Sequence, residues 1–182
     1  MLCLGGVAAI GAMAYGTESI DRVDKIFGPG NTFVMLAKKQ VYGVVGIDAL
    51  PGPTETVIVA DDGANPAWVA ADLLAQCEHR FDSCAVLISP SRALLLAVKA
   101  EVEKQVKRLA TKANAWRSWT ERGALVQTRS IAEAIDLSNL IAPEHLELHL
   151  DNPLALLGDV KNAGCILLGM YSPAAISDYL AG

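Results

Sequence analysis

The sequence predicts an α/β protein built on doubly wound, mostly parallel, Rossmann-like sheets. Short runs rich in Val, Ile and Leu alternate along the chain with segments of helical periodicity. Hydrophobic residues make up 52% of the 182 positions, whereas charged residues make up 19% and aromatic residues 5%. This balance is typical of sheets buried on both faces, and it excludes a disordered chain.

Each strand is predicted from a short β-rich run, and the helices are predicted from periodicity or from capping signals. The expected strands are residues 2–4, 25–27, 44–49, 55–60, 85–88, 124–127, 146–150 and 165–168. The expected helices are residues 7–15, 32–41, a segment opening at Asn65-Pro66 and reaching His79, 92–109, 130–139, and short helices after Asn152-Pro153 and Ser172-Pro173. Residues 92–109 give the clearest case, because their Leu and Val side chains share one helical face.

Pro51-Gly52-Pro53 is the most plausible domain boundary. Residues 1–53 and 54–182 are therefore expected to form two partial Rossmann-like domains. The first expected strand and the last expected helix are both cut short, which suggests that the chain is a fragment of a longer protein, truncated at both ends.

Composition also excludes several classes of function. A net charge of −5 with scattered Lys and Arg argues against nucleic-acid binding, which needs a clustered basic face. No apolar run approaches membrane-spanning length, and no basic leader precedes an apolar segment. The four cysteines show no paired spacing, so we expect free thiols in a reducing cytoplasm.

Three groups of polar residues are candidates for a site. Gln76 and His79 lie three positions apart on one face of an expected helix, and Glu144-His145 is an adjacent acid and imidazole. With Asp178, they offer ligands that a divalent metal accepts and an acid/base pair.

Each candidate also has a purely structural interpretation. Gln76 and His79 can be a surface amide and a histidine that interacts with the helix dipole, which spacing alone favours. Pro143 indicates that Glu144 and His145 lie on a connection, where they can be a solvated pair after a helix stop. Adjacent extended residues point to opposite sides, so both reach one substrate only if the backbone turns there. An isolated Asp178 can simply favour a helix N-terminus.

Two further features are weaker. Gly28-Pro29-Gly30-Asn31 opens a helix after a strand, where backbone N–H groups can meet a phosphate, although a simple turn is the favoured interpretation. His149 alternates with Leu148 and Leu150, which predicts an outward-facing strand residue.

Five motifs, in order along the whole chain, resemble the signatures of histidinol dehydrogenases. They are residues 23–31 (VDKIFGPGN), 46–55 (GID followed by GPTE), 70–79 (AADLLAQCEH), 141–148 (IAPEHLEL) and 177–182 (SDYLAG). The resemblance covers less than half of a family member. It implies a zinc-dependent, NAD-linked enzyme that oxidises L-histidinol to L-histidine through the aldehyde, in histidine biosynthesis.

The resemblance also implies a role for particular residues. One Zn²⁺ per subunit is expected on Gln76, His79 and Asp178, with a fourth histidine ligand from the C-terminal tail of a homodimer partner, beyond Gly182. Glu144 and His145 are expected to be the catalytic pair, and Asn31 to contact NAD. Residues expected to contact the substrate are Thr54, Gln76, His79, His145 and Asp178.

The chain departs from the family pattern at two positions. Ala8 stands where the family commonly has a glutamine that contacts NAD, and Thr54 stands where it commonly has serine. Two alternatives therefore remain: a family paralogue that oxidises another small alcohol, such as a sulfonated diol, or a catalytically incomplete α/β fragment.

Overall fold

The computed structural model describes residues 3–28, 30–48, 50, 55–79 and 83–176. The chain divides into two compact units, Met1–Gly52 together with Gly182, and Pro53–Ala181. The division between them falls within the Pro51-Gly52-Pro53 segment.

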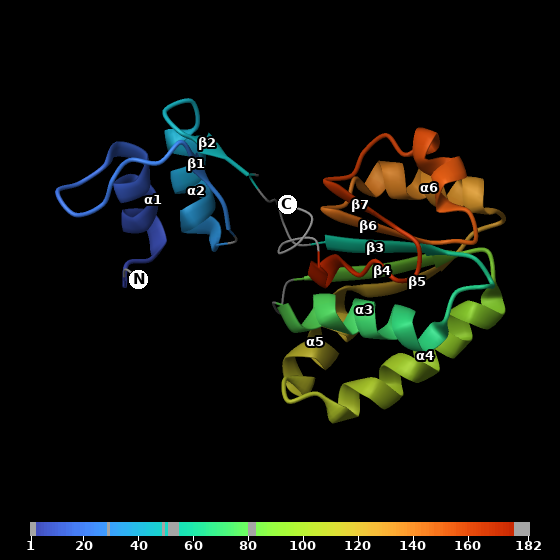
Figure 1. Ribbon diagram of the computed structural model, residues 1–182. Helices are drawn as coiled ribbons and strands as arrows, with labels where there is room; N and C mark the ends of the chain where they lie inside the picture. Colours follow the sequence, from blue (N-terminus) through green and yellow to red (C-terminus); the bar gives the residue numbers. More distant parts are fainter. Residues whose placement is uncertain (1–2, 29, 49, 51–54, 80–82, 177–182) are drawn as a thin grey trace. The chain divides into compact units, whose positions relative to one another are not determined.

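The larger unit is built on a five-stranded sheet in which every strand pair is parallel. The strand order is β5-β4-β3-β6-β7, as Figure 1 shows. The strands are β3 (Glu55–Ala60), β4 (Cys84–Ser89), β5 (Gly123–Gln127), β6 (His145–His149) and β7 (Cys165–Leu168).

Helices cover both faces of this sheet (Figure 1). One face packs against α3 (Pro66–His79), α4 (Arg92–Gln105), η1 (Val106–Arg108) and α5 (Lys112–Arg122). The other face packs against α6 (Ile131–Ile141) and η2 (Pro153–Asp159). The predicted doubly wound, parallel α/β fold is therefore confirmed.

Alternation along the strands decides which side chains meet which helices. In β3, Ile58 and Ala60 belong to the core beneath α3, whereas Val57 and Val59 belong to the core beneath α6. The parallel register aligns Ile58 with Glu147 and Val57 with Leu146. Successive strand residues point to opposite faces, so the odd-numbered residues of β6 face α3.

The smaller unit contains α1 (Gly6–Tyr15), β1 (Lys25–Ile26), α2 (Thr32–Val41) and β2 (Gly46–Ile47). Its two short strands pair in parallel. A small apolar core joins the helices and strands, and its buried members are Ile10, Ala14, Ile26, Ala37, Val41 and Val45.

Several element predictions need correction. Cys3 and Leu4 form no strand, and the strand expected at 44–49 is reduced to Gly46–Ile47 in the described residues. The helix expected at 92–109 ends at Gln105 and continues as the 3₁₀ turn η1. The expected last helix shows helical conformation at 174–176 before the described residues end.

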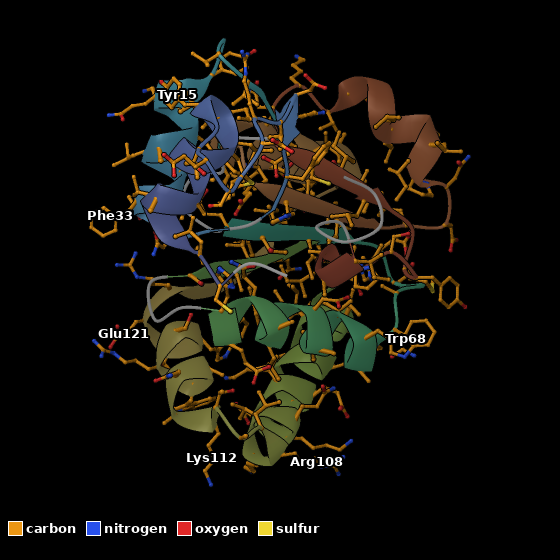
Figure 2. The ribbon with its side chains drawn as sticks, turned by 60° about the vertical axis from the view of Figure 1, so that its left-hand side comes forward. Tyr15, Phe33, Trp68, Arg108, Lys112 and Glu121 are labelled. Atoms are coloured by element: carbon orange, nitrogen blue, oxygen red, sulfur yellow. The ribbon has the colours of Figure 1, made fainter. Side chains whose placement is uncertain are left out.

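The helix α5 was not predicted. Figure 2 shows Arg108, Lys112 and Glu121 pointing outward from η1 and α5, and all three side chains are exposed. Only Ala115 and Ser118 of α5 are buried, and so narrow an apolar stripe gives almost no periodic signal. Among the described residues, no helix combines the length and apolar character needed to cross a membrane.

Candidate active site

The backbone turns sharply just before Glu144. Ala142, which follows α6, adopts the left-handed conformation (φ 54°, ψ 57°) that non-glycine residues rarely take. The next residues are held by β7, because the Gly164 N–H donates to the Pro143 carbonyl (3.0 Å) and the Cys165 N–H donates to the Glu144 carbonyl (2.8 Å). A Cβ atom at position 164 would lie 2.7 Å from the Glu144 carbonyl oxygen, so this close approach requires glycine.

This turn brings the Glu144 and His145 side chains together. His145 Nδ1 lies 3.8 Å from Glu144 Oε2, and the two side chains are 13% and 18% exposed. The expectation that both residues lie on a connection is correct only for Glu144, because His145 already pairs with β3 and β7 as the first residue of β6. A partly exposed carboxylate beside an imidazole is suited to proton transfer.

Gln76 lies in the last turn of α3 and is 8% exposed. Its Oε1 accepts a hydrogen bond of 2.9 Å from the Thr56 hydroxyl at the start of β3. The interpretation of Gln76 as a surface residue is therefore wrong. Thr56 is also the register partner of His145 in β6, so Thr56 links the end of α3 to the start of β6.

His79 ends α3, three positions after Gln76, and its side chain is exposed. Residues at this spacing lie on one side of a helix. The amino ends of β3 and β6 and the carboxyl end of α3 thus bring Gln76, His79, Glu144 and His145 to one edge of the sheet. Asp178 and Thr54 lie outside the described residues.

Asn31 belongs to the smaller unit, where it caps α2. Its side-chain oxygen accepts hydrogen bonds from the Phe33 and Val34 N–H groups, both 3.1 Å. The Gly28 N–H donates to Asp48 Oδ2 (2.8 Å). These three N–H groups are already bonded within the unit, which favours the turn interpretation of this loop over a phosphate cradle.

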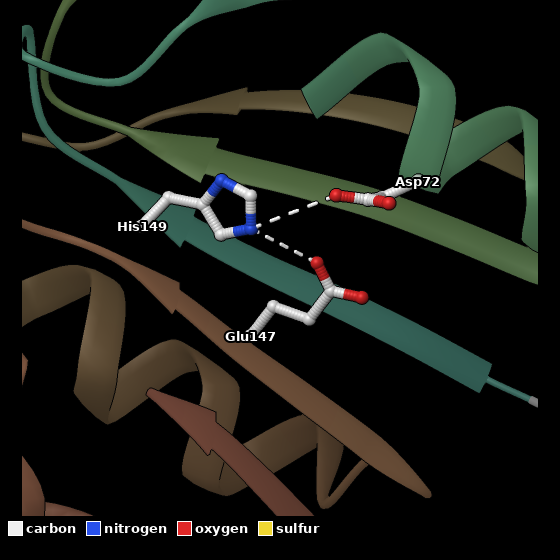
Figure 3. Close-up of side chains that lie close together, drawn as sticks. All are labelled: Asp72, Glu147 and His149. Atoms are coloured by element: carbon white, nitrogen blue, oxygen red, sulfur yellow. Dashed lines mark hydrogen bonds and ion pairs between the residues drawn. The ribbon is translucent and has the colours of Figure 1, made fainter. Parts of the chain in front are cut away.

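A second polar cluster lies deeper on the same face of β6 (Figure 3). His149 Nε2 lies 3.0 Å from Glu147 Oε2 and 3.8 Å from Asp72 Oδ2 of α3. Each of the three residues offers a potential ligand atom within 4.8 Å of the others. Glu147 and His149 are both 0% exposed, so the prediction of an outward-facing His149 is wrong.

The physical reason is that alternation along a strand determines the face of the sheet on which a side chain lies. It does not determine whether a helix buries that face. In this fold, α3 covers the odd-numbered residues of β6. The pKa of Asp72 is raised to about 7, first by burial and then by the neighbouring negative charge of Glu147, whereas His149 opposes the shift. The repeating pattern His145-Leu-Glu147-Leu-His149 was the available signal for a polar stripe along one face.

Hydrogen bonds cross the carboxyl edge of the sheet at the point where ligands bind in many open α/β folds. The strand order changes direction between β3 and β6, and there the Asp61 N–H donates to the His149 carbonyl (3.2 Å). The Asp61 carboxylate accepts from the N–H groups of Gly63 (3.0 Å) and Asp151 (2.8 Å). These bonds link the segments that follow β3 and β6, and a hollow of about 400 Å³ at the same edge is lined by Asp61, Asp62, Pro90, Ser91 and Ile131.

A hollow of about 380 Å³ runs along the outer edge of β7. Its lining includes Cys165, the register partner of His145, and it continues to Tyr171, Ser172 and Ile176. Part of the space beside the candidate site is therefore formed by the segment that follows β7.

Comparison with known proteins agrees with this arrangement. The family model for histidinol dehydrogenase matches residues 1–182. The chain is 53% identical over 182 residues to the histidinol dehydrogenase of Thermus thermophilus, covering 100% of this chain and 44% of that protein. It is 52% identical over 179 residues to that of Moorella thermoacetica, covering 98% of this chain and 42% of the relative.

A solved structure gives the same result. The crystal structure of histidinol dehydrogenase from Elizabethkingia anophelis matches with a TM-score of 0.82 and 41% sequence identity, over 98% of this chain and 41% of that chain. The chain thus spans less than half the length of the relatives that it matches. The 182 residues belong to the histidinol dehydrogenase family.

Proposed function

We propose that the protein carrying this chain is a zinc-dependent, NAD-linked dehydrogenase that oxidises L-histidinol to L-histidine through histidinaldehyde. Family membership supports histidinol as the substrate and histidine biosynthesis as the role. The observation that carries the proposal is the Thr56 link, which joins Gln76 at the end of α3 to His145 at the start of β6. Because the chain spans less than half of its relatives, the activity belongs to the whole protein, and the isolated chain is expected to be inactive.

The donor atoms fit a zinc site in their chemistry. Zinc accepts imidazole nitrogen and carboxylate oxygen, and an amide oxygen is a similar hard donor. The hydrogen bond from Thr56 occupies one of the two lone pairs of Gln76 Oε1, so this bond is compatible with coordination. Gln76, His79 and Asp178 would hold the ion. When bound, it would supply a Lewis acid that orients the substrate through its amine and imidazole nitrogens.

His145 is the proposed base of the first oxidation. It takes the proton of the substrate hydroxyl while the carbon-bound hydrogen leaves as hydride to the first NAD⁺, which gives the aldehyde. An imidazole suits this step because its ordinary pKa lies near neutrality.

Glu144 is the proposed activator of water in the second oxidation. Its carboxylate takes a proton from the water that adds to the aldehyde carbonyl, and the pair returns a proton to the former carbonyl oxygen, which gives the hydrate. The hydrate then loses a hydride to a second NAD⁺ and a proton to solvent through the pair, which leaves the carboxylic acid product. A site that retains the aldehyde prevents the escape of a reactive intermediate.

The remaining assignments rest on the family resemblance. Asn31 would contact NAD, and its side-chain oxygen already caps α2, so the amide NH₂ is the group available to donate. Thr54 would contact the substrate. A homodimer in the cytoplasm, with a histidine from the partner's C-terminal tail on the zinc, completes the proposal.

Removal of the exposed zinc ligand tests the metal site. In a full-length protein that carries this chain, His79→Ala is expected to abolish stoichiometric zinc, measured by elemental analysis after dialysis. Arg122→Ala is the matched control, because Arg122 ends the neighbouring helix α5 and is also exposed. Retention of one zinc per subunit in His79→Ala would contradict the ligand assignment.

A further inference from the structure

Glu147 is buried at the meeting point of three parts of the larger unit. Its Oε2 lies 3.0 Å from His149 Nε2, and its Oε1 accepts a hydrogen bond of 3.0 Å from the backbone N–H of Ala174. The carboxyl group of Asp72 of α3 lies beside it, since one side-chain atom of each of Asp72, Glu147 and His149 lies within 4.8 Å of the others. One carboxyl group thus contacts β6, α3 and the segment that follows β7.

The tautomer of His149 argues against a metal in this cluster. His149 is 0% exposed, and its Nδ1 atom has no hydrogen-bond partner among the described residues. If Nε2 bound a metal, the ring proton would lie on Nδ1, where it would be buried without an acceptor. Histidine ligands almost always donate that second N–H to a nearby acceptor. The proton therefore belongs on Nε2, directed at the carboxyl groups (Figure 3).

A proton on Asp72 allows the two neighbouring carboxyl groups to hydrogen-bond to each other. Two ionised carboxylates have only acceptor atoms and cannot hydrogen-bond to each other. The raised pKa of Asp72, caused first by burial and then by Glu147, is consistent with a proton held between them. Glu147 is then fixed from two sides, by the Asp72 proton and by the His149 N–H.

The Ala174 contact is one of the long-range contacts in the described part of the segment that follows β7; another is the ring contact of Tyr171 with Trp68 of α3, whose centroids lie 5.1 Å apart. The Ser172 N–H and hydroxyl bond to the nearby carbonyls of Gly169 and Leu168, and the Ile176 N–H bonds to the Pro173 carbonyl. The Glu147 bond to Ala174 spans 27 positions. This hydrogen bond joins the segment to β6, the strand that begins with His145.

We propose that Glu147, locked by Asp72 and His149, is a positioning residue that clamps the backbone at Ala174. Asp178 follows Ala174 by four positions in the sequence, so a change in the backbone at Ala174 is expected to affect this carboxylate. The consequence for zinc rests on the proposed function, because only that function makes Asp178 a ligand. The clamp itself does not depend on it.

The test removes the clamp in a full-length protein that carries this chain. Glu147→Leu is expected to accelerate hydrogen–deuterium exchange of a peptide covering residues 172–176. It should also weaken zinc binding by about 10- to 100-fold, the usual effect of losing a group that orients a metal ligand. Glu103→Leu is the matched control, because Glu103 is exposed on α4.

Asp72→Asn serves as the conservative variant. Its amide NH₂ replaces the shared proton as a donor to Glu147, so exchange and zinc affinity should stay close to wild type. Asp72→Ala removes the donor from a partly exposed position, and it should accelerate exchange even if Glu147→Leu fails to fold.

Each outcome is decisive for one of the two claims. Unchanged exchange at 172–176 in folded Glu147→Leu or Asp72→Ala protein overturns the clamp. Faster exchange with unchanged zinc affinity overturns the positioning role. If the wild-type protein bound no zinc, the proposed function would fail, whereas the exchange measurement would still report on the clamp.

Discussion

Two acid–imidazole pairs lie along β6 and the residue that precedes it, and they differ chiefly in their access to solvent. Glu144 and His145 at the start of β6 are 18% and 13% exposed, with their nearest nitrogen and oxygen atoms 3.8 Å apart. The side chains of Glu147 and His149 are 1% and 0% exposed, with the corresponding atoms 3.0 Å apart. Within six residues, the same two residue types therefore occupy a partly exposed position and a buried position.

The comparison shows that burial of the side chains, rather than residue type, distinguishes the two pairs. A buried pair has no route for a substrate, and its polar atoms are used to hold α3 and the Ala174 segment. A partly exposed pair can exchange protons with a bound molecule. The predictions below compare the two pairs, beginning with the largest expected effect.

Replacing each histidine by glutamine should separate catalysis from stability. In the full-length protein, His145→Gln is expected to lower kcat for histidinol by about 10²- to 10⁴-fold, the usual contribution of a general base. His149→Gln should leave most of the activity but lower the free energy of unfolding by roughly 1–3 kcal/mol, because buried polar partners are disturbed. Steady-state kinetics and urea unfolding of both variants provide the measurements.

The opposite effects of the two substitutions on activity and stability would contradict this comparison. Loss of activity in His149→Gln at full stability, with an active His145→Gln protein, would show that the deeper pair performs the chemistry.

Glu144→Gln should affect the two oxidations unequally. In the proposed mechanism the first oxidation uses His145 as base, whereas the hydration of the aldehyde uses the Glu144 carboxylate, so the second half-reaction should slow more. Activity measured separately from L-histidinol and from histidinaldehyde tests this difference. Equal slowing of both half-reactions would count against Glu144 as the water activator.

The smallest expected effect is a pH dependence of stability that originates in the buried cluster. The pKa of Asp72 rises from 3.8 to about 7 on folding, so the folded state binds this proton more tightly than the unfolded state. The stabilisation is complete below about pH 4 and is lost as pH rises through about 7. The titratable groups that face Asp72 are Glu147 and His149 on β6, whereas β3 presents Ile58 and Ala60 there.

Urea midpoints at pH 5 and pH 8 measure this effect. Wild-type protein should lose stability between these values, and Asp72→Asn should lose less, because its side chain does not titrate. Asp136→Asn, an exposed change on α6, should keep the wild-type dependence. An identical pH dependence in wild type and Asp72→Asn would show that the cluster holds no shared proton.

Particular elements show why some of the fold was predictable. Residues 55–60 and 165–168 were predicted as strands with the bounds that the structure has, because their apolar runs end at clear breaks. The capping residues Ser130 and Asn65 act as predicted, since each side chain accepts from a backbone N–H near its helix start. The helix α5 escaped prediction because its polar surface hides a stripe of only two buried residues.

The site was predictable only in part. The resemblance marked Gln76 and Glu144-His145 as members of one site, and their meeting at one edge of the sheet is consistent with it. Thr56, which links them, carried no signal of its own, because its importance comes from the β3–β6 register. The roles of Asp178, Thr54 and Asn31 remain predictions.

The sequence by itself determined the family, the parallel α/β architecture and the alternation of faces along β6, because these follow from local patterns and motif order. Only the tertiary structure decided which face of β6 is sealed, where Asp72 meets Glu147 and His149, and why Glu144 and His145 converge. These features depend on contacts between residues far apart in the chain, such as Asp72 with His149 and Glu144 with Gly164. Burial and strand register are set by those contacts, and local sequence does not encode them.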